Sequence, residues 1–80
     1  MTKEQIEKVF TYHPPTKNQI PRYEIIRNLA KEFALQLSAY CPDSAEKTLA
    51  IRKLQECVMY ANASIAINEK EEIPNGKTNV

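Results

Sequence analysis

The sequence predicts an all-α fold in which two long helices pair as an antiparallel hairpin. Apolar residues recur at helical spacing over about residues 22–40 and again over about residues 44–69. Cys41-Pro42-Asp43-Ser44 separates the two segments, and a connection that short joins antiparallel neighbours. No segment has the turn chemistry and alternation of strands. Because 80 residues lie near the lower limit for a chain that folds alone, we expect a homo-oligomer.

A short helix is expected to precede the hairpin, from about residue 3 to residue 10, with Thr2 as its N-cap. Pro14, Pro15 and Pro21 predict an irregular loop over residues 11–21, because proline interrupts a helix and restricts the residue before it. The next helix then runs over about 22–40. Its predicted buried face comprises Ile26, Leu29, Ala30, Phe33, Leu37 and Tyr40.

The last helix is expected over about residues 44–69, with Asp43 or Ser44 as its cap. Its apolar seam has near-heptad spacing and comprises Ala50, Ile51, Leu54, Val58, Ala61 and Ile65. The helix is longer than its neighbour and projects beyond it, where it could pair with another subunit. Residues 1–70 are thus expected to form one domain, and the polar segment 71–80, with the only glycine, a flexible tail.

Charge and composition exclude several classes of function. The formal net charge is +1, but from Lys8 to Lys31 five basic residues face one acid, a local excess of +4. Such a patch suits a few phosphates and is too small for a long duplex. We expect no membrane span, no signal peptide and a cytoplasmic protein. Cys41 and Cys57 form no metal motif with the single histidine, so they are expected to be buried apolar groups, and no metal or cofactor is predicted.

Rings and cations gather in the first half of the chain. Tyr12 could stack on a base and His13 could donate to a base edge or phosphate, or both rings could pack the loop onto the hairpin. Phe10 is expected to anchor the first helix, with contact to a ligand as its other role. No nucleophile motif or phosphate-binding glycine loop accompanies His13, which favours a binding protein over an enzyme.

Arg27 and Lys31 share one helical face, where they could bind phosphodiesters beside an intersubunit groove. The alternative is a solvated basic edge in which Arg27 pairs with Glu24. Asn62, at the edge of the seam, could specify the register of an oligomer or bind a ligand. Asn68 is either a further ligand contact or simply the polar end of the helix.

Four elements occur in one order that resembles a known family. They are Phe10-x-Tyr12-His13-x-Pro15, Tyr23-x-x-Ile26-Arg27-x-x-Ala30-Lys31-x-x-Ala34, Cys41-Pro42-Asp43-Ser44 and Val58-Met59-x-Ala61-Asn62-Ala63-x-Ile65-Ala66-x-Asn68-Glu69. The chain is similar to the hairpin-domain family of bacteriophage proteins that includes the anti-CBASS cyclic-oligonucleotide sponge and the hairpin region of a Thoeris inhibitor. The resemblance runs from about Phe10 to Glu69.

This resemblance implies a helical homo-oligomer, usually a hexamer, that sequesters cyclic immune messengers in the cytoplasm of the infected bacterial host without degrading them. The implied ligands are cyclic dinucleotides such as cyclic GMP-AMP, and also cyclic trinucleotides. Tyr12, His13, Arg27 and Lys31 match the family's ligand-contacting positions, in a pocket between subunits. Ile67 stands where some members have a basic residue, which puts the trinucleotide site in doubt. The alternative functions are a small helical nucleic-acid-binding dimer and a protein-interaction hairpin.

Overall fold

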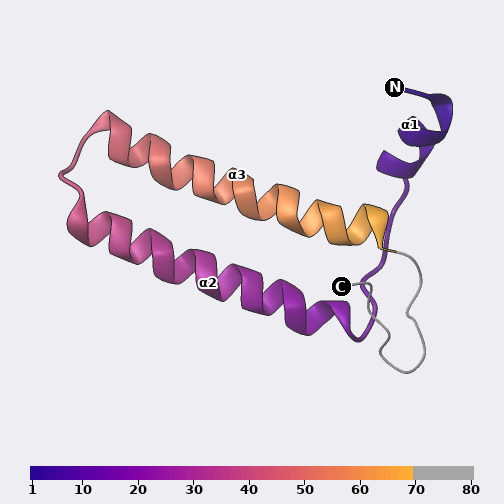
Figure 1. Cartoon of the computed structure of the whole chain (residues 1–80), viewed down its shortest axis with the longest axis horizontal. Helices are drawn as coiled ribbons and strands as arrows, with labels where there is room; N and C mark the ends of the chain where they lie inside the picture. The colour runs from indigo at the N-terminus through magenta and orange to yellow at the C-terminus, as the bar shows by residue number, and fades with distance from the viewer. Residues whose placement is uncertain (70–80) are drawn as a thin grey trace.

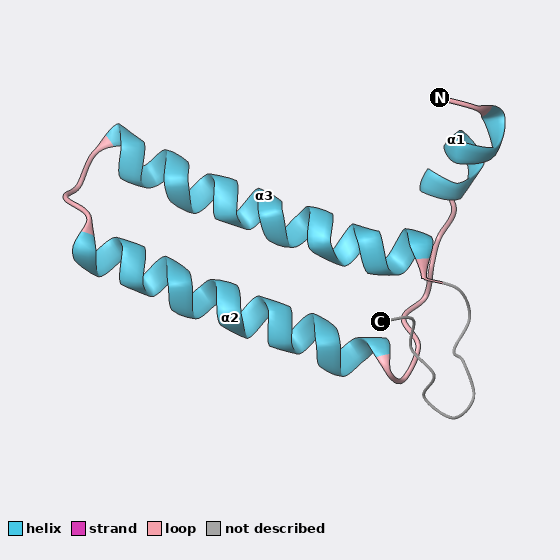
Figure 2. Ribbon diagram, viewed as in Figure 1, coloured by secondary structure: helices cyan, strands magenta, loops and turns pink. Residues whose placement is uncertain are grey.

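The computed structural model describes residues 1–69, which form three helices and no strand. The helices are α1 (Lys3–Val9), α2 (Gln19–Tyr40) and α3 (Ala45–Asn68). Helices α2 and α3 lie side by side as an antiparallel hairpin, and α1 projects away from its open end (Figures 1 and 2). The prediction of an all-α hairpin preceded by a short helix is confirmed for this part of the chain. The predicted tail 71–80 lies outside the described residues.

Helix α1 begins with a capping box that the sequence predicted in part. The Gln5 backbone N–H donates to Thr2 Oγ1 at 3.1 Å, and the Thr2 backbone N–H donates to Gln5 Oε1 at 2.8 Å. Two backbone N–H groups without helical acceptors are thereby satisfied, which stabilises the first turn. The helix ends at Val9, and Phe10 is its C-cap, whose N–H donates to the Ile6 carbonyl at 3.1 Å.

Helix α2 begins at Gln19, three residues before its predicted start, so the loop is 11–18 and the placement of Pro21 in it is wrong. Pro21 is the third residue of the helix. The N–H groups of the first turn have no acceptor within a helix, so proline sacrifices no hydrogen bond there, and its fixed φ already suits the helix. The Gln19 and Ile20 N–H groups both donate to the Thr16 carbonyl, at 3.1 and 3.2 Å.

The turn between α2 and α3 is held by side chains on both sides. Ser44 caps α3, since its Oγ accepts from the Lys47 N–H at 3.1 Å. Lys47 Nζ donates to Asp43 Oδ1 and to the Ser38 carbonyl, each at 2.8 Å. Lys47 therefore ties the last turn of α2 to the first turn of α3.

The open end of the hairpin is closed by a polar cluster that we call the clasp, consisting of Gln19, Arg22 and Glu69. The Arg22 guanidinium donates to both carboxylate oxygens of Glu69, at 2.6 and 2.7 Å. Gln19 Nε2 donates to Glu69 Oε1 at 2.8 Å, and Gln19 Oε1 accepts from the Thr16 N–H at 3.0 Å. Gln19 is 5% exposed, and these bonds satisfy its amide. The start of α2 is thus joined to the residue that ends α3.

The apolar face predicted to be buried is not buried in the single chain. Among the described residues no hydrophobic side chain is fully buried, and Leu29 and Phe33 remain 67% and 53% exposed. Two helices cover only one strip of each other, so residues beside that strip need a third layer. Cys57 is exposed and Cys41 half-buried, so the expectation of two buried cysteines is also wrong.

Helix α1 does not pack on the hairpin through its apolar stripe. Ile6 and Val9 are 45% and 41% exposed, and Phe10 is 82% exposed. Phe10 therefore does not anchor α1 within its own chain, contrary to expectation. A helix of seven residues is marginal in water without tertiary contacts, so α1 is an element that lacks its packing partner within the described chain.

Candidate functional site

The loop between α1 and α2 presents one ring to solvent and holds the other. Tyr12 is 81% exposed, so the alternative in which it packs the loop onto the hairpin is wrong. His13 is half-buried, and its Nε2 lies 2.8 Å from the Lys8 carbonyl oxygen. Because a carbonyl only accepts, this contact places a proton on Nε2 and leaves Nδ1 of the neutral ring to accept from a ligand. The loop can therefore offer a stacking surface beside an oriented imidazole.

The predicted cations lie on one face of the hairpin, which we call the polar face and define by Arg27, Lys31 and Asn62. Ile26 and Ala30 line the seam with α3, and Arg27 and Lys31 each follow one of them by one residue. Asn62 follows Ala61, which lines the seam from α3. In an antiparallel pair of α-helices, residues that follow a seam residue by one position lie on the same face of the pair, whichever helix they belong to. Arg27, Lys31 and Asn62 therefore share one face.

Neither cation is occupied by a neighbour within the described residues. Arg27 and Lys31 are exposed, and no carboxylate lies within 4.0 Å of either. The ion pair between Glu24 and Arg27, which the alternative interpretation required, does not form in this part of the chain. Two like charges one helical turn apart repel each other weakly, and a bound anion would remove that repulsion.

Asn62 carries an unusual polar atom. Its Oδ1 is inaccessible to solvent and has no hydrogen-bond partner among the described residues. A buried carbonyl oxygen without a donor costs about 1–3 kcal/mol, so such an atom generally has a partner in the functional state. A donor from a ligand or from another subunit would satisfy it, and both of the roles predicted for Asn62 stay open.

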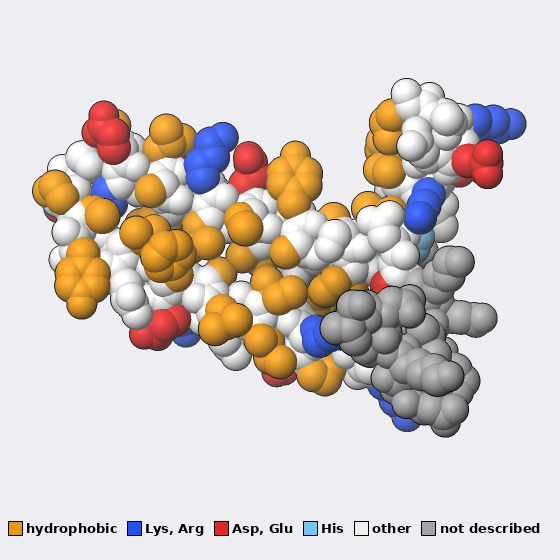
Figure 3. Space-filling view, in the orientation of Figure 1, with side chains coloured by type: hydrophobic (Ala, Val, Ile, Leu, Met, Phe, Trp, Pro, Cys, Tyr) orange, Lys and Arg blue, Asp and Glu red, His pale blue; other side chains and the backbone are white. Residues whose placement is uncertain are grey.

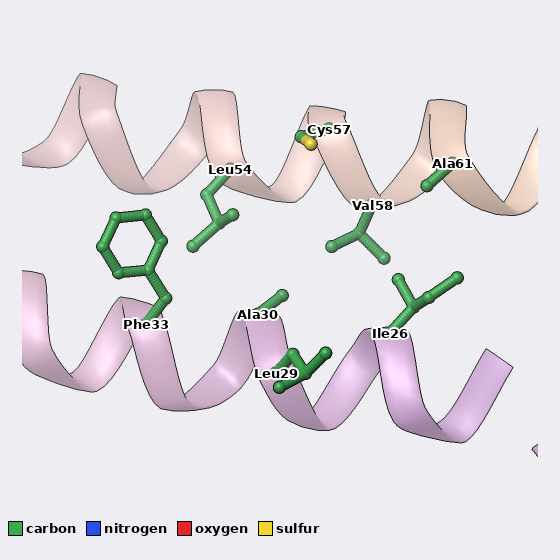
Figure 4. A pocket seen from close by; sticks show the side chains of 8 residues that line it. All are labelled: Ile26, Leu29, Ala30, Phe33, Leu54, Cys57, Val58 and Ala61. Atoms are coloured by element: carbon green, nitrogen blue, oxygen red, sulfur yellow. The ribbon is translucent and has the colours of Figure 1, made fainter. Parts of the chain in front are cut away.

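The opposite face of the hairpin is an apolar groove, which we call the groove face. Its volume is about 260 Å³, and its lining comes from four residues of each helix: Ile26, Leu29, Ala30, Phe33, Leu54, Cys57, Val58 and Ala61. The two rows face each other across the seam (Figure 4). Apolar side chains gather along this seam over the length of the hairpin (Figure 3). With no polar group to orient a small molecule, the groove face suits packing against another helix.

Sequence reasoning missed the clasp. Arg22 counted as part of the free basic patch, but Glu69 neutralises it. Within residues 1–69, Arg27 and Lys31 are the cations of helix α2 without an ion-pair partner. The hydrogen bonds from Arg22, and then from Gln19, lower the pKa of Glu69 from 4.5 to about 2. The four-residue turn could have indicated this contact, since counting back from it sets the start of α2 opposite the end of α3.

The remaining predicted positions lie apart from one another. Asn68 is exposed at the last position of α3, and Ile67 beside it is half-buried. No hydrogen bond or ion pair joins Tyr12 or His13 to the polar face within the described residues. Residues 1–69 of one chain therefore do not assemble these groups into one enclosed pocket.

The described residues contain no group of three or more His, Cys, Asp or Glu side chains arranged to hold a metal ion. None of their helices combines the length and the apolar character required to cross a bilayer.

Comparison with known families decides what this hairpin is. The family model for the Acb2/Tad1 hairpin domain matches residues 2–66, which include α1, the loop, α2 and nearly all of α3. The chain belongs to the Acb2/Tad1 hairpin-domain family. The predicted resemblance to the anti-CBASS sponge, whose hairpin is shared with a Thoeris inhibitor, is thereby confirmed.

Membership in the Acb2/Tad1 family points to an anti-defence protein that sequesters cyclic nucleotide messengers. The match ends at residue 66, so Ile67, Asn68 and the clasp residue Glu69 lie beyond it. The chain gives no significant match to any curated protein or to any solved structure.

Proposed function

We propose that this protein is a non-enzymatic sponge that binds cyclic dinucleotides such as cyclic GMP-AMP and keeps them from the defence effectors of the infected bacterial host. The observation that carries the proposal is the Acb2/Tad1 family match over residues 2–66. The protein would act in the host cytoplasm, where such messengers are made. The protein would release the ligand chemically unchanged.

The described side chains supply the groups that such a ligand requires. Arg27 and Lys31 neutralise the two phosphodiesters, Arg27 with paired hydrogen bonds and Lys31 as a mobile charge. Tyr12, exposed on the loop, stacks on a base, and His13 orients it through the free Nδ1. The unpaired Oδ1 of Asn62 accepts a base N–H from the same face of the hairpin as Arg27.

We further propose that the site is completed by a second copy of the chain. Hydrophobic residues make up 42% of the sequence, yet none is fully buried among the described residues. Apolar burial is the main force that stabilises a fold, so a chain with this exposure gains most by covering its groove face with another subunit. A homo-oligomer, which the family suggests is a hexamer, would set the Tyr12 loop of one subunit against Arg27 and Lys31 of another. A two-fold pocket suits a symmetric ligand.

Cyclic trinucleotides form a separate part of the proposal. Ile67 brings no charge to the last turn of α3, so this chain offers less compensation for three phosphates than a basic residue there would. Asn68, exposed beside it, can still donate or accept hydrogen bonds. Phe10, exposed at the base of the loop, could add a second stacking surface. We expect trinucleotide binding to be weaker than dinucleotide binding.

Calorimetry with a panel of cyclic di- and trinucleotides tests the proposal. Tyr12→Ala and Lys31→Ala are expected to weaken binding about tenfold or more, because stacking and charged hydrogen bonds are each worth about 1–3 kcal/mol. Tyr12→Phe should retain most of the affinity if stacking dominates, and Lys3→Ala on α1 is the charge-matched control. The mass of the assembly should not change in any of these variants.

Two results would contradict the proposal. One is unaltered affinity in both alanine variants, which would remove these residues from the site. The other is affinity that rises with the length of linear nucleic acid and falls steeply with salt, which indicates binding to a polymer. Recovery of the intact messenger after the protein is denatured would exclude hydrolysis, and mass spectrometry of the released ligand measures it.

A further inference from the structure

A third surface, distinct from the groove face and the polar face, lies on the side of α3 that points away from α2. Six residues there follow one another at intervals of four, three, four, three and four, and we call them the outer seam: Leu49, Lys53, Glu56, Tyr60, Ala63 and Ile67. At about 100° per residue they fall within an arc of about 80°, opposite the seam-lining Leu54 and Val58.

Two members of the outer seam, Leu49 and Tyr60, are largely exposed, whereas Ala63 and Ile67 at its end are half-buried. Leu49 is 54% exposed and Tyr60 71%, and the neighbouring Met59 is 63% exposed. Apolar and charged side chains alternate along this edge of α3 (Figure 3). Heptad spacing is the pattern by which helices pair, since it keeps one row facing a partner over several turns.

The centre of the outer seam is charged and the two ends are apolar. Lys53 Nζ lies 3.7 Å from Glu56 Oε1, and these side chains are 66% and 53% exposed. An exposed pair at i, i+3 adds little to the stability of a helix. A pair within the helix also does not account for the apolar residues at either end of the row.

We propose that a second copy docks its α3 antiparallel on the outer seam, about a two-fold axis between Lys53 and Glu56. In this register Lys53 faces Glu56 of the second copy, and Leu49 faces its Tyr60. The axis repeats both contacts, so the part of the seam from Leu49 to Tyr60 is complementary to its own reverse. A parallel arrangement would set lysine against lysine and glutamate against glutamate. Charge complementarity therefore identifies a second copy as the occupant.

The same register places the turn of the second copy at the end of α3 beside which α1 stands. It sets Asn68 opposite the turn that follows Tyr40 of the second copy. Helix α1 stands beyond this end of α3, on the side that faces away from α2 (Figure 1). Phe10 and Tyr40 are 82% and 83% exposed in the single chain.

This inference rests on the self-association in the proposed function but uses a different surface. Covering the groove face alone produces one kind of contact between copies. Two distinct two-fold contacts on one chain generate a closed dihedral assembly when their axes cross, and a hexamer is one such assembly. If the groove-face contact is two-fold as well, the outer seam would supply the second contact of such an assembly.

Charge exchange at the centre of the outer seam is the test. Lys53→Glu sets two carboxylates against each other, and Glu56→Lys sets two ammonium groups against each other. Because facing like charges destabilise an interface, each change should raise the concentration needed for assembly by about tenfold or more. The double variant Lys53→Glu/Glu56→Lys reverses every pair and should assemble close to the level of the unaltered protein. Glu32→Lys, an exposed reversal on α2, is the matched control.

Native mass spectrometry and sedimentation measure assembly, and circular dichroism verifies that each variant is helical. The inference is overturned if both single variants assemble like the unaltered protein, or if the double variant assembles no better than the singles. A cross-link provides a second measurement that does not depend on stability. With Cys41 and Cys57 replaced by serine, mixing the Lys53→Cys and Glu56→Cys chains should yield more disulfide dimer than either chain alone. Equal yields would overturn the register.

Ligand binding distinguishes this inference from the proposed function. All assembly measurements are made without ligand. If no cyclic nucleotide binds while charge exchange weakens and restores assembly, the proposed function fails and the outer seam remains. If the messenger binds while charge exchange has no effect, the outer seam is refuted and the proposed function remains.

Discussion

The groove face and the polar face are built from the same two helices but differ in what they offer. The groove face includes the seam residues and those one position before them, such as Leu29 and Cys57. The polar face consists of residues one position after a seam residue, such as Arg27 and Asn62. Apolar side chains without a cover favour association, whereas unpaired cations and an unpaired amide oxygen favour an anionic polar ligand. Under the proposed function, one hairpin would hold a binding site on one face and an assembly surface on the other.

The largest expected effect is a loss of assembly when a charge is placed in the groove face. Phe33→Asp places a carboxylate among Leu54 and Cys57, where assembly would bury it, at a cost of about 3–5 kcal/mol for an unpaired buried charge. We expect the association constant of the assembly to fall more than a hundredfold, as measured by sedimentation equilibrium. Asn28→Asp, exposed on the same helix, should have no such effect. Equal dissociation in both variants would contradict a role for the groove face.

The second-largest expected effect is a loss of ligand affinity at the polar face, with assembly unchanged. Arg27→Ala should lower the affinity for a cyclic dinucleotide by about tenfold to a hundredfold, since a hydrogen bond to a charged group is worth about 1.5–3 kcal/mol. Arg27→Lys should recover only part of the loss, because lysine cannot form paired hydrogen bonds. Calorimetry checks both changes. Full recovery with lysine would mean that charge alone acts at this position.

A smaller effect decides between the two roles of Asn62. Asn62→Leu removes the unpaired buried oxygen, so the melting temperature of the ligand-free protein should stay the same or rise. We expect affinity for the cyclic dinucleotide to fall about tenfold while the mass of the assembly is unchanged. Native mass spectrometry and calorimetry are made on the same sample. A mixture of masses with unchanged affinity would assign Asn62 to register instead.

The smallest effect belongs to the clasp, which lies apart from the two faces. Because Arg22 and Gln19 lower the pKa of Glu69 to about 2, its contribution to stability is complete above about pH 4.5 and declines as the pH falls toward 2. Glu69→Gln should therefore reduce the melting temperature slightly at pH 7, and the difference from the unaltered protein should shrink at pH 3. Thermal melts by circular dichroism measure it. A difference that is constant with pH would remove the ion pair from this role.

The helices were predictable because their causes are local. Thr2 and Ser44 cap helices through residues three positions ahead, and the apolar spacing identifies the seam between α2 and α3. The start of α2 was predicted wrongly because Pro21 was taken as an interruption, although the first turn accepts proline. The predicted contacts of Tyr12, His13, Arg27 and Lys31 with a ligand stay predictions.

Other features depend on which residues meet across the hairpin, and a spacing rule within one helix does not contain that information. From the sequence, Glu69 is simply the polar end of a helix. In the structure the register of the hairpin places it beside Arg22, 47 positions away. Asn62 reads as one edge residue among several until packing excludes both solvent and donors from its Oδ1. The exposure of Phe10 follows likewise from the direction in which α1 leaves the hairpin (Figure 1). Periodicity and capping act between near neighbours and therefore specify the helices, whereas burial and pairing follow from contacts between residues distant in the chain.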